Sequence, residues 1–252
     1  MFPLPVRESW RPALADVLDV IYPPQCWLCG AEAADALACG DHRLPSGPEG
    51  PRCGLCRAAL PELMPDGYRC SGCTRRPPGH LGLECLGDYG PESALREWIL
   101  AWKHGGRGFL VEPLAEALGA YWIAGWSAGA VRPDCDARLV PVPLHPVRHL
   151  ERGFDQAAEL ARAISERTGV ACAAGLRRRR YTSAQGSPGA VSRAANVREA
   201  FAGRPQLLRG CQVWLVDDVV ASGSTVAACA AAARRAGARQ VRVLALARAL
   251  LR

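Results

Sequence analysis

The chain has 252 residues, of which 49% are hydrophobic, and it carries a formal net charge of +7 at pH 7. This length accommodates one large domain or two modest ones, and the apolar content excludes an intrinsically disordered chain. The moderate positive charge suits nucleic acid and small anionic ligands alike, so it does not choose between these partners.

Residues 1–22 are predicted to form an N-terminal extension without a secretory signal. Pro3, Arg7 and Glu8 occur where a signal peptide would have an uninterrupted apolar region. The longest apolar stretch further along, residues 109–131, contains two glutamates and a proline, so we expect no membrane span. A cytoplasmic location is the resulting expectation.

Residues 23–88 are predicted to form a double zinc ribbon. Pairs of ligand residues separated by two positions recur four times here, and each pair can present two ligands to one tetrahedral zinc ion. Pairing in chain order gives a first site of Cys26, Cys29, Cys39 and His42, and a second site of Cys53, Cys56, Cys70 and Cys73. Disulfides and free thiols are the alternatives, and disulfides are disfavoured in a cytosolic chain.

These two zinc sites are expected to be structural. The segment has few large apolar side chains, so bound metal would supply stability that a small core cannot. Four protein ligands leave no open position for a reacting water, which indicates a scaffold or docking surface. Cys85 has no evident partner and is expected to be a buried thiol.

From residue 89 to 252 the pattern changes to alternating helices and strands. The predicted helices span 95–103, 110–122, 156–167 and 224–235, and the predicted strands span 138–143, 213–217 and 240–247. Asp155 is a plausible N-cap for the third helix, and Gly237 closes the fourth. This alternation predicts an α/β domain with a parallel sheet and right-handed crossovers.

Three segments between these elements are candidates for binding anions. Lys103 precedes a glycine-rich turn, where it either faces a phosphate group or solvates the helix end. Arg148 and Arg152 lie in a basic loop after the first strand, and their guanidinium groups suit phosphate oxygens. Gly153 beside them permits close approach of the backbone. A basic surface loop without a ligand is the alternative.

The third segment is long and polar. It begins near the cluster Arg177 to Arg180, which is either a solvated turn or a contact for diphosphate or nucleic acid. Gln185, Arg193 and Asn196 lie in the connection that follows, which has the length of an active-site lid. A surface loop without a ligand is again the alternative.

The most specific pattern is the 13-residue stretch from Val213 to Thr225. An apolar strand ends at Asp217 and Asp218, and a loop of small residues leads into a helix. The loop offers backbone N–H groups and hydroxyls to a phosphate dianion. Two carboxylates beside such a loop repel the phosphate unless a divalent cation or ribose hydroxyls lie between them. The stretch therefore predicts a site for a phosphorylated sugar with Mg²⁺.

This stretch resembles the phosphoribosyl pyrophosphate (PRPP) motif of type I phosphoribosyltransferases, and nearly the whole chain from Cys26 resembles the ComF family. The resemblance includes the zinc knuckles, the Trp-Lys-His-Gly turn, the Arg-Gly-Phe-Asp-Gln segment and the acid pair. Four positions depart from the family pattern. Ala221 and Ser222 replace two threonines, Asp155 replaces an asparagine, and His42 replaces a cysteine.

The resemblance implies a type I phosphoribosyltransferase-like fold, a parallel sheet flanked by helices, with a small N-terminal zinc-ribbon domain. It further implies that Asp217 and Asp218 hold ribose hydroxyls and Mg²⁺-bound water, and that Arg148, Arg152 and Lys103 meet the pyrophosphate. The residues implied to hold the 5′-phosphate are Ala221, Ser222, Gly223, Ser224 and Thr225.

Two functions from different classes follow from this resemblance. The first is an enzyme, a pentosyl transferase that binds Mg-PRPP and passes the phosphoribosyl group to an unidentified acceptor, with a role in competence and DNA uptake. The second is a non-catalytic factor that processes single-stranded DNA, uses PRPP or a nucleotide as a signal, and works with a DNA-uptake helicase. A third hypothesis is an adaptor protein that binds only zinc and in which the PRPP motif is vestigial.

Overall fold

The structure is a computed structural model that describes residues 23–33, 38–65, 67–75, 81–104, 106–127, 132–144, 153–179 and 200–250. The chain divides into two compact units, Met1–Leu44 and Pro45–Arg252. In the first unit, Gln25 forms a bridge with Glu32 across a tight turn, and the short 3-10 helix η2 (Gly40–His42) follows.

The second unit is built on a parallel sheet of four strands in the order β1-β6-β5-β2. Their bounds are Leu83–Tyr89 for β1, Arg138–Pro141 for β2, Gln212–Val220 for β5 and Gln240–Ala249 for β6. Each adjacent pair is parallel. The predicted parallel sheet is therefore confirmed.

Within the four-stranded sheet, β1 is the strand that the sequence pattern did not predict. It lies at the end of the segment assigned to the zinc ribbons, and it crosses the predicted domain boundary at residues 88 and 89. Its buried positions include Glu84 as well as apolar residues, so neither an apolar run nor an alternating pattern is evident. The three-part domain scheme stays a prediction.

Helices flank the sheet at the predicted positions. The main helices are α3 (Ala94–His104), α4 (Val111–Ser127), α6 (Gln156–Thr168) and α9 (Ser224–Arg235), with η3 (Gly108–Leu110), α2 (Ser71–Thr74) and α8 (Pro205–Leu208) as short turns. The Asp155 side chain accepts a hydrogen bond from the Ala158 backbone N–H at 3.1 Å, which confirms the predicted N-cap.

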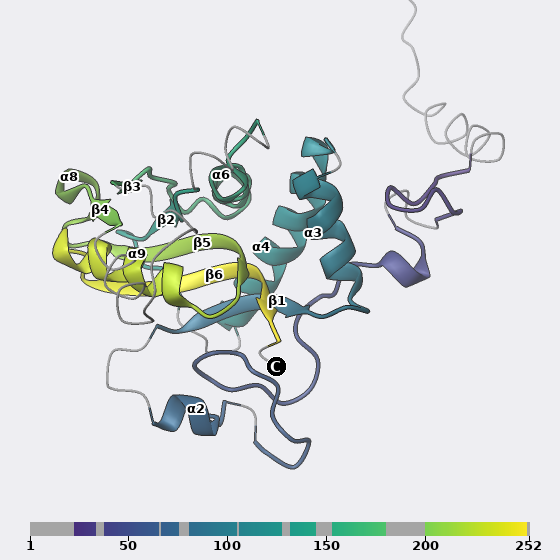
Figure 1. Cartoon of the computed structure of the whole chain (residues 1–252), viewed down its shortest axis with the longest axis horizontal. Coiled ribbons are helices and arrows are strands. Elements are labelled where there is room, and N and C mark those ends of the chain that lie inside the picture. Colours follow the sequence, from purple (N-terminus) through teal and green to yellow (C-terminus); the bar gives the residue numbers. More distant parts are fainter. Residues whose placement is uncertain are drawn as a thin grey trace, which may run out of the picture. The chain divides into compact units, whose positions relative to one another are not determined.

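The alternation of side chains along β5 shows which helices cover which face. Val213 and Leu215 belong to a buried cluster with Val226 and Cys229 of α9. The Trp214 ring points to the other face, where its centroid lies 4.8 Å from that of Trp122 in α4. Helix α4 in turn packs against α6. Helices α3, α4 and α6 therefore share one face, and α9 covers the other (Figure 1).

The chain winds in opposite directions on the two sides of the β2–β5 pair. After β2 and α6, the backbone returns beside the outer edge of β2, where Leu139 forms a parallel bridge with Cys172. After β5 and α9, the chain instead joins β6 on the far side of β5. The winding direction thus reverses between β2 and β5, which makes this pair the topological switch point of the sheet.

An antiparallel hairpin, β3 (Leu176–Arg178) and β4 (Phe201–Gly203), lies beside α9. Gly203 makes this packing possible, because a Cβ atom there would lie 2.5 Å from the Ala236 Cβ atom. Among the described residues, no helix combines the length and apolar character that crossing a membrane requires.

Candidate functional site

The switch point places two loops at the same edge of the sheet. In parallel sheets, ligands bind outside the carboxyl ends of the strands where the winding direction reverses. Strand β2 ends at Pro141 and leads into residues 142–155, whereas β5 leads into residues 221–223 and then α9. The acid pair near the end of β5 therefore lies at the position that the fold favours for a ligand.

Asp217 and Asp218 lie within β5 rather than beyond its end. The strand was predicted to stop at Asp217, but it continues to Val220 because the backbone keeps pairing with β6. Consecutive residues of a strand point to opposite faces. Asp218 accordingly reaches α3, where its Oδ2 atom lies 2.7 Å from Lys103 Nζ, while Asp217 faces the side covered by α9.

The electrostatics of this acid pair favour one retained proton. Burial and the neighbouring Asp218 carboxylate raise the pKa of Asp217 to about 8. The Asp218 backbone N–H donates to Asp217 Oδ1 at 2.9 Å and only partly offsets this. The site thus holds a carboxyl group that would ionise more readily next to a cation.

Among the described residues, Lys103 is the positively charged partner of Asp218. Both side chains are largely buried, at 12% exposure for Lys103 and 15% for Asp218. The sequence left open whether Lys103 faces a phosphate or solvates the end of α3. The structure instead places its ammonium group on Asp218, because α3 packs against β1 and β6 and its last turn brings Lys103 within reach of the acid pair.

The loop of small residues after β5 has the backbone form of an anion cradle. Gly223 adopts the left-handed conformation with φ +77° and is the N-cap of α9, so the following backbone N–H groups point out of the helix end. Ser222 Oγ lies 2.9 Å from Ser224 Oγ, and residues 221, 222, 224 and 225 are exposed. The loop thus presents hydroxyls and N–H groups to solvent at the positive end of the α9 dipole.

Several predicted site residues lie outside the described residues. Among them are Arg148 and Arg152 of the basic loop, and Gln185, Arg193 and Asn196 of the predicted lid, so their roles stay predictions. Gly153 is described, and it adopts φ +75°, a conformation that favours glycine. The next residue, Phe154, lies with its ring centroid 6.2 Å from that of Trp102 in α3.

The first predicted metal site is assembled within the unit Met1–Leu44. The ligand atoms of Cys26, Cys29, Cys39 and His42 all lie within 4.8 Å of one another. The Cys29 and Cys39 Sγ atoms are 3.8 Å apart, and His42 Nδ1 lies 3.1 Å from Cys39 Sγ. Zinc with four thiolates at about 2.3 Å requires sulfur atoms about 3.8 Å apart, so this donor set fits a tetrahedral ion.

The second site has the same form in the other unit. The Sγ atoms of Cys53, Cys56, Cys70 and Cys73 lie within 4.8 Å of one another, and Cys56 and Cys70 are 3.8 Å apart. Burial alone would raise the pKa of Cys53, but hydrogen bonds from backbone N–H groups lower it to about 6. Backbone groups outweigh burial in the same way at Cys26 and lower its pKa to about 6. Burial and neighbouring thiols raise the pKa values of Cys56 and Cys73, and neighbouring thiols raise the pKa of Cys29 despite a backbone hydrogen bond. In each cluster one cysteine therefore ionises readily, and a bound cation would favour ionisation of the others.

The loop around Cys53 and Cys56, which is the first knuckle of the second metal site, contacts the edge strand β1 through ion pairs that the sequence analysis did not predict. Arg57 Nε donates to Glu84 Oε2 at 2.9 Å, and Arg52 Nη1 lies 2.5 Å from Asp88 Oδ2. The Leu83 backbone N–H also donates to the Leu55 carbonyl at 2.9 Å. The Leu83 bond occupies one backbone position on the outer edge of β1, and the ion pairs hold the loop against the strand.

Glu84 is the centre of this contact. It is 5% exposed, and in addition to Arg57 it accepts from Arg242 Nη2 at 3.2 Å and from the Tyr121 hydroxyl at 3.3 Å. Burial lowers the pKa of Arg242 despite the carboxylate beside it. The sequence offered one signal for this cluster, a glutamate inside an otherwise apolar stretch.

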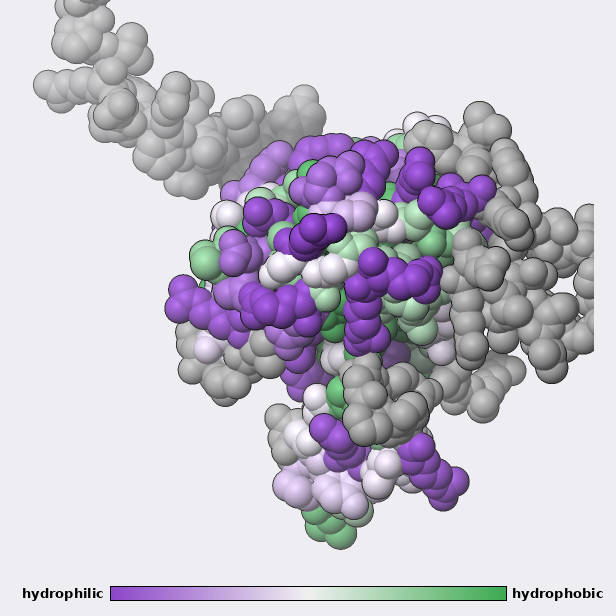
Figure 2. Space-filling view, turned by 90° about the vertical axis from the view of Figure 1, so that its left-hand side faces the viewer, coloured by the Kyte–Doolittle hydropathy of each residue, from purple (hydrophilic) through white to green (hydrophobic). Residues whose placement is uncertain are grey.

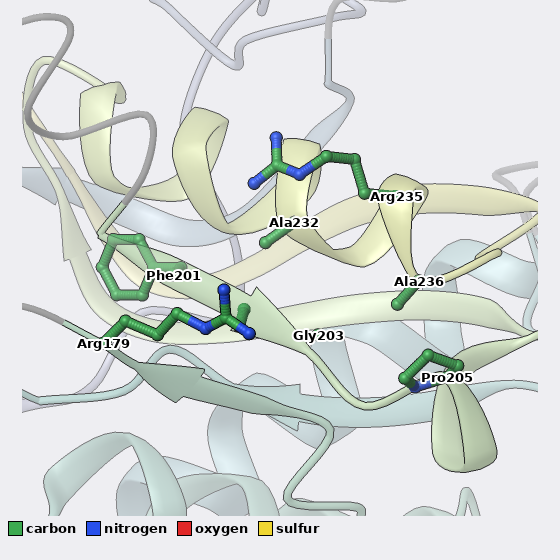
Figure 3. A pocket seen from close by; sticks show the side chains of 8 residues that line it. Arg179, Phe201, Gly203, Pro205, Ala232, Arg235 and Ala236 are labelled. Carbon is green, nitrogen blue, oxygen red and sulfur yellow. The ribbon is translucent and has the colours of Figure 1, made fainter.

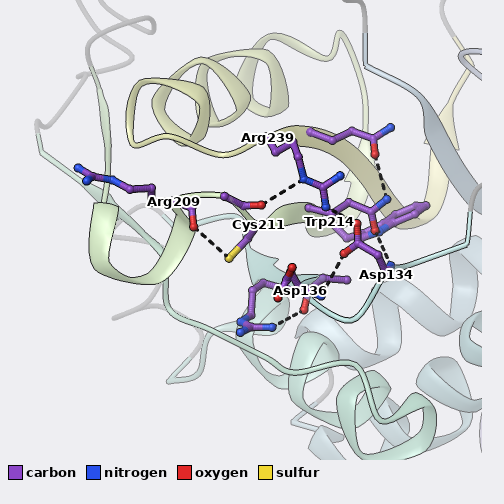
Figure 4. Close-up of polar contacts among 11 residues, drawn as sticks. Asp134, Asp136, Arg209, Cys211, Trp214 and Arg239 are labelled. Atoms are coloured by element: carbon purple, nitrogen blue, oxygen red, sulfur yellow. Dashed lines mark hydrogen bonds and ion pairs between the residues drawn. The ribbon is translucent and has the colours of Figure 1, made fainter.

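A separate polar network lies at the end of the sheet opposite the acid pair (Figure 4). Gln212 Oε1 accepts from Trp214 Nε1 at 3.0 Å and from the Asp134 backbone N–H at 3.2 Å, and Arg239 pairs with the Asp134 carboxylate. These bonds satisfy buried polar atoms between strands and loops. The network lies at the amino ends of the strands, so it is structural rather than part of the ligand site.

Comparison with known proteins finds relatives over most of the chain, although no family model matches it. The chain is 36% identical over 203 residues to the DNA utilization protein YhgH of Salmonella typhimurium, covering 79% of this chain and 84% of the relative. It is 32% identical over 238 residues to the protein of the same name from Escherichia coli K12, covering 90% and 98%. Competence protein F of Haemophilus influenzae is 28% identical over 203 residues, covering 79% and 85%.

Among solved structures, the chain is similar to the allosteric regulatory enzyme of purine biosynthesis, with 25% identity and a TM-score of 0.36 over 54% of this chain. It has the same identity and TM-score with the glutamine PRPP amidotransferase of B. subtilis, over 53% of this chain. In both cases the match covers 26% of the solved chain, so this protein spans about a quarter of their length.

Proposed function

Because the chain belongs to the ComF family of DNA utilization and competence proteins, we propose that it binds Mg-PRPP at the β2–β5 switch point and transfers the phosphoribosyl group to an acceptor during DNA use. The observation that supports this most strongly is the position of Asp217 and Asp218 beside a small-residue loop at this edge of the sheet. This arrangement offers anionic oxygens to a sugar and N–H groups to its phosphate.

In this proposal each part of the site has one role. The carboxylates of Asp217 and Asp218 hold the ribose 2′- and 3′-hydroxyls, and the loop from residue 221 to 225 holds the 5′-phosphate. Mg²⁺, when bound with the substrate, supplies positive charge to the pyrophosphate. Arg148 and Arg152 add guanidinium groups for the same purpose, with Gly153 allowing close approach. Gln185, Arg193 and Asn196 form the lid.

The chemistry proposed for this site is displacement of pyrophosphate from C1 of the ribose. Departure of pyrophosphate leads bond formation to the acceptor, so positive charge develops on the ribose ring. The nearby carboxylates stabilise that charge, and the bound geometry supplies most of the remaining rate enhancement. Little covalent work is required of the protein.

In this scheme Lys103 exchanges one anionic partner for another. Lys103 pairs with Asp218, and a pyrophosphate bound with Mg²⁺ would offer its ammonium group several phosphate oxygens instead of one carboxylate. We propose that the ammonium group then turns from Asp218 toward the pyrophosphate.

We further propose that each cysteine-rich cluster holds one structural zinc ion, since four ligand atoms fit a tetrahedral site and leave no open position. The three-part organisation, with an extension at 1–22, ribbons at 23–88 and a transferase-like domain at 89–252, belongs to the same proposal. So does a cytoplasmic location, since cysteines spaced for metal binding suit a reducing compartment.

The proposal is tested by calorimetric titration of Mg-PRPP into the wild type and the Asp217→Asn/Asp218→Asn variant. We expect binding by the wild type and a loss of at least about a hundredfold in the variant, because both carboxyl groups proposed to hold the ribose and Mg²⁺ are replaced by amides. The matched control is Asp134→Asn/Asp136→Asn, which makes the same chemical change at the other end of the sheet. Wild-type protein that is folded and metal-loaded but does not bind Mg-PRPP would sink the proposal.

A second candidate function rests on the names of the relatives, which refer to DNA utilization and competence. In that alternative the chain is a non-catalytic factor that binds single-stranded DNA or a DNA-uptake helicase and uses PRPP or a nucleotide as a signal. Release of pyrophosphate on addition of an acceptor would favour the enzyme. Tight DNA binding with a steep salt dependence and no pyrophosphate release would favour the factor.

A further inference from the structure

A groove lies between the β3–β4 hairpin and the C-terminal half of α9, away from the acid pair. It has a volume of about 690 Å³. Its lining residues are Arg179, Phe201, Ala202, Gly203, Pro205, Ala232, Arg235 and Ala236 (Figure 3). From Ser224 to Arg235, α9 rises about 1.5 Å per residue, or about 16 Å in all, so this groove is separate from the loop at the start of the helix.

The groove exists because small residues line its floor. Ala232 and Ala236 are one turn apart on α9 and are both buried, and Gly203 of β4 lies against them. A Cβ atom at Gly203 would lie 2.5 Å from the Ala236 Cβ atom and 2.8 Å from the Ala232 carbonyl oxygen. Ala232 and Ala236 are covered by this packing, so the apolar floor that remains accessible in the groove belongs to Ala202, Gly203 and Pro205.

Two arginines from different elements lie on this groove. Figure 3 shows Arg179 beside β4 and Arg235 on α9, with Ala232 between them. The Arg179 backbone N–H donates to the Ala200 carbonyl at 2.7 Å, which fixes its position at the base of the hairpin. Both side chains are exposed, and among the described residues neither guanidinium has an acidic partner. No acidic residue is among those that line the groove.

The surface around the groove has the same character. Figure 2 shows the side of the molecule on which α8, β3 and β4 lie, with hydrophilic side chains surrounding paler, small residues. Arg235 in the last turn of α9 also complements the negative end of the helix dipole, which by itself would explain one arginine. It does not explain Arg179 on the other wall, or the row of small residues between the two.

We propose that this groove is a second ligand site, and that its ligand is a nucleotide. Guanidinium groups bind phosphate oxygens with two parallel hydrogen bonds, so Arg179 and Arg235 provide for the phosphate. The apolar floor of Ala202, Gly203 and Pro205 provides for the flat base. The volume lies within the range of small-molecule sites, and it is larger than inorganic phosphate needs. This site is independent of PRPP binding at the acid pair.

The test uses the Asp217→Asn/Asp218→Asn variant, which weakens the first site but keeps its phosphate loop, so substitutions in the groove are needed to assign the binding. AMP and GMP are titrated calorimetrically, with adenosine and inorganic phosphate as partial ligands. We expect at least one nucleotide to bind about tenfold or more tightly than either partial ligand, because only a nucleotide uses both the arginines and the apolar floor.

Two single substitutions in the same background locate the site. Arg179→Ala and Arg235→Ala should each weaken nucleotide binding about tenfold or more, since each removes a charge-assisted contact. Arg234→Ala is the matched control, because it removes the same charge from the adjacent position of α9, outside the groove lining. Ala202→Leu narrows the groove and should weaken nucleotide binding while leaving inorganic phosphate unaffected.

Three results would overturn the inference. The first is that neither nucleotide binds the folded protein. The second is an equal loss from Arg234→Ala and Arg235→Ala, which would mean nonspecific attraction to positive charge. The third is a preference for single-stranded oligonucleotides that grows with their length and falls steeply with salt, which would make this face a polyanion surface instead.

Discussion

At the residue scale, the acid pair shows how a shift of one position along a strand gives two identical side chains different surroundings. Asp217 and Asp218 are adjacent, yet the alternation of β5 sends them to opposite faces. Asp218 meets Lys103 at 2.7 Å, whereas Asp217 is turned toward the α9 side and its pKa is raised to about 8 by burial and by Asp218. Identical side chains in adjacent positions therefore have different partners and different burial.

The Lys103–Asp218 pair can be measured by a double-mutant cycle. Lys103→Met should lower the free energy of unfolding by about 3 kcal/mol, because it leaves the largely buried Asp218 without its cation. Asp218→Asn in the same chain should recover much of that loss. Urea unfolding at pH 7 gives the four free energies. Additive effects of the two substitutions would show that the pair is not energetically coupled.

Asp217 makes a distinct contribution to the pH dependence of stability. Its pKa in the folded protein is raised to about 8, above the value of about 3.9 in an unfolded chain, so the folded state binds the proton more tightly. Stability from this group is complete below pH 4 and is lost as the pH rises toward 8. Asp217→Asn should therefore be less sensitive to pH than the wild type in urea unfolding between pH 5 and 9, without Mg²⁺ or PRPP. Parallel pH profiles for the two proteins would contradict the raised pKa.

At the scale of secondary-structure elements, the loop around Cys53 and Cys56 and strand β1 stabilise each other. Arg57 is, among the described residues other than glycine, the only one with positive φ, at 55°, and it occupies the turn of the knuckle. The corresponding position in the first metal site is Gly30, with φ 75°. A left-handed arginine costs about 1 kcal/mol relative to glycine, and its bonds to buried Glu84 offset that cost.

The substitution Arg57→Gly separates these two effects. It relieves the backbone strain but removes a charge partner from Glu84, so we expect a net loss of about 2 kcal/mol in the free energy of unfolding. The double variant Arg57→Gly/Glu84→Gln should be more stable than Arg57→Gly alone, because no uncompensated carboxylate remains. Thermal and urea unfolding measure both. A stabilising effect of Arg57→Gly alone would mean that strain outweighs the ion pair.

At the scale of the whole molecule, metal content is the property that the cysteine clusters determine. We expect two zinc ions per chain by elemental analysis, and one after Cys53→Ser/Cys56→Ser, because each cluster has four ligand atoms within 4.8 Å. Loss of the second ion should also lower the melting temperature of the unit Pro45–Arg252, since the loop around Cys53 and Cys56 contacts the edge strand β1.

Cys85→Ser provides the control for this experiment. Cys85 is 1% exposed, belongs to neither cluster, and has a pKa raised to about 12 chiefly by burial. The variant should retain two zinc ions, and the wild-type thiol should resist alkylation in the native protein. A variant of Cys53 and Cys56 that still binds two ions would refute the assignment of the second site.

The sequence by itself determined the local elements and the chemistry of the motifs. Helix periodicity, the Asp155 cap and the apolar run before Asp217 are short-range features, because each depends on residues within one or two turns of one another. The two metal clusters also followed from spacing, since a pair of ligands two positions apart is already close to a tetrahedral site.

Only the tertiary structure decided which distant segments meet. The edge strand β1 and its Glu84 cluster join residues more than 150 positions apart, as the contact between Glu84 and Arg242 shows. The reversal of winding between β2 and β5 depends on where Cys172 and β6 lie in the sheet. The partner of Lys103 likewise depends on how α3 packs against the sheet. Such pairings are set by the packing of whole faces, and no local pattern in the chain encodes them.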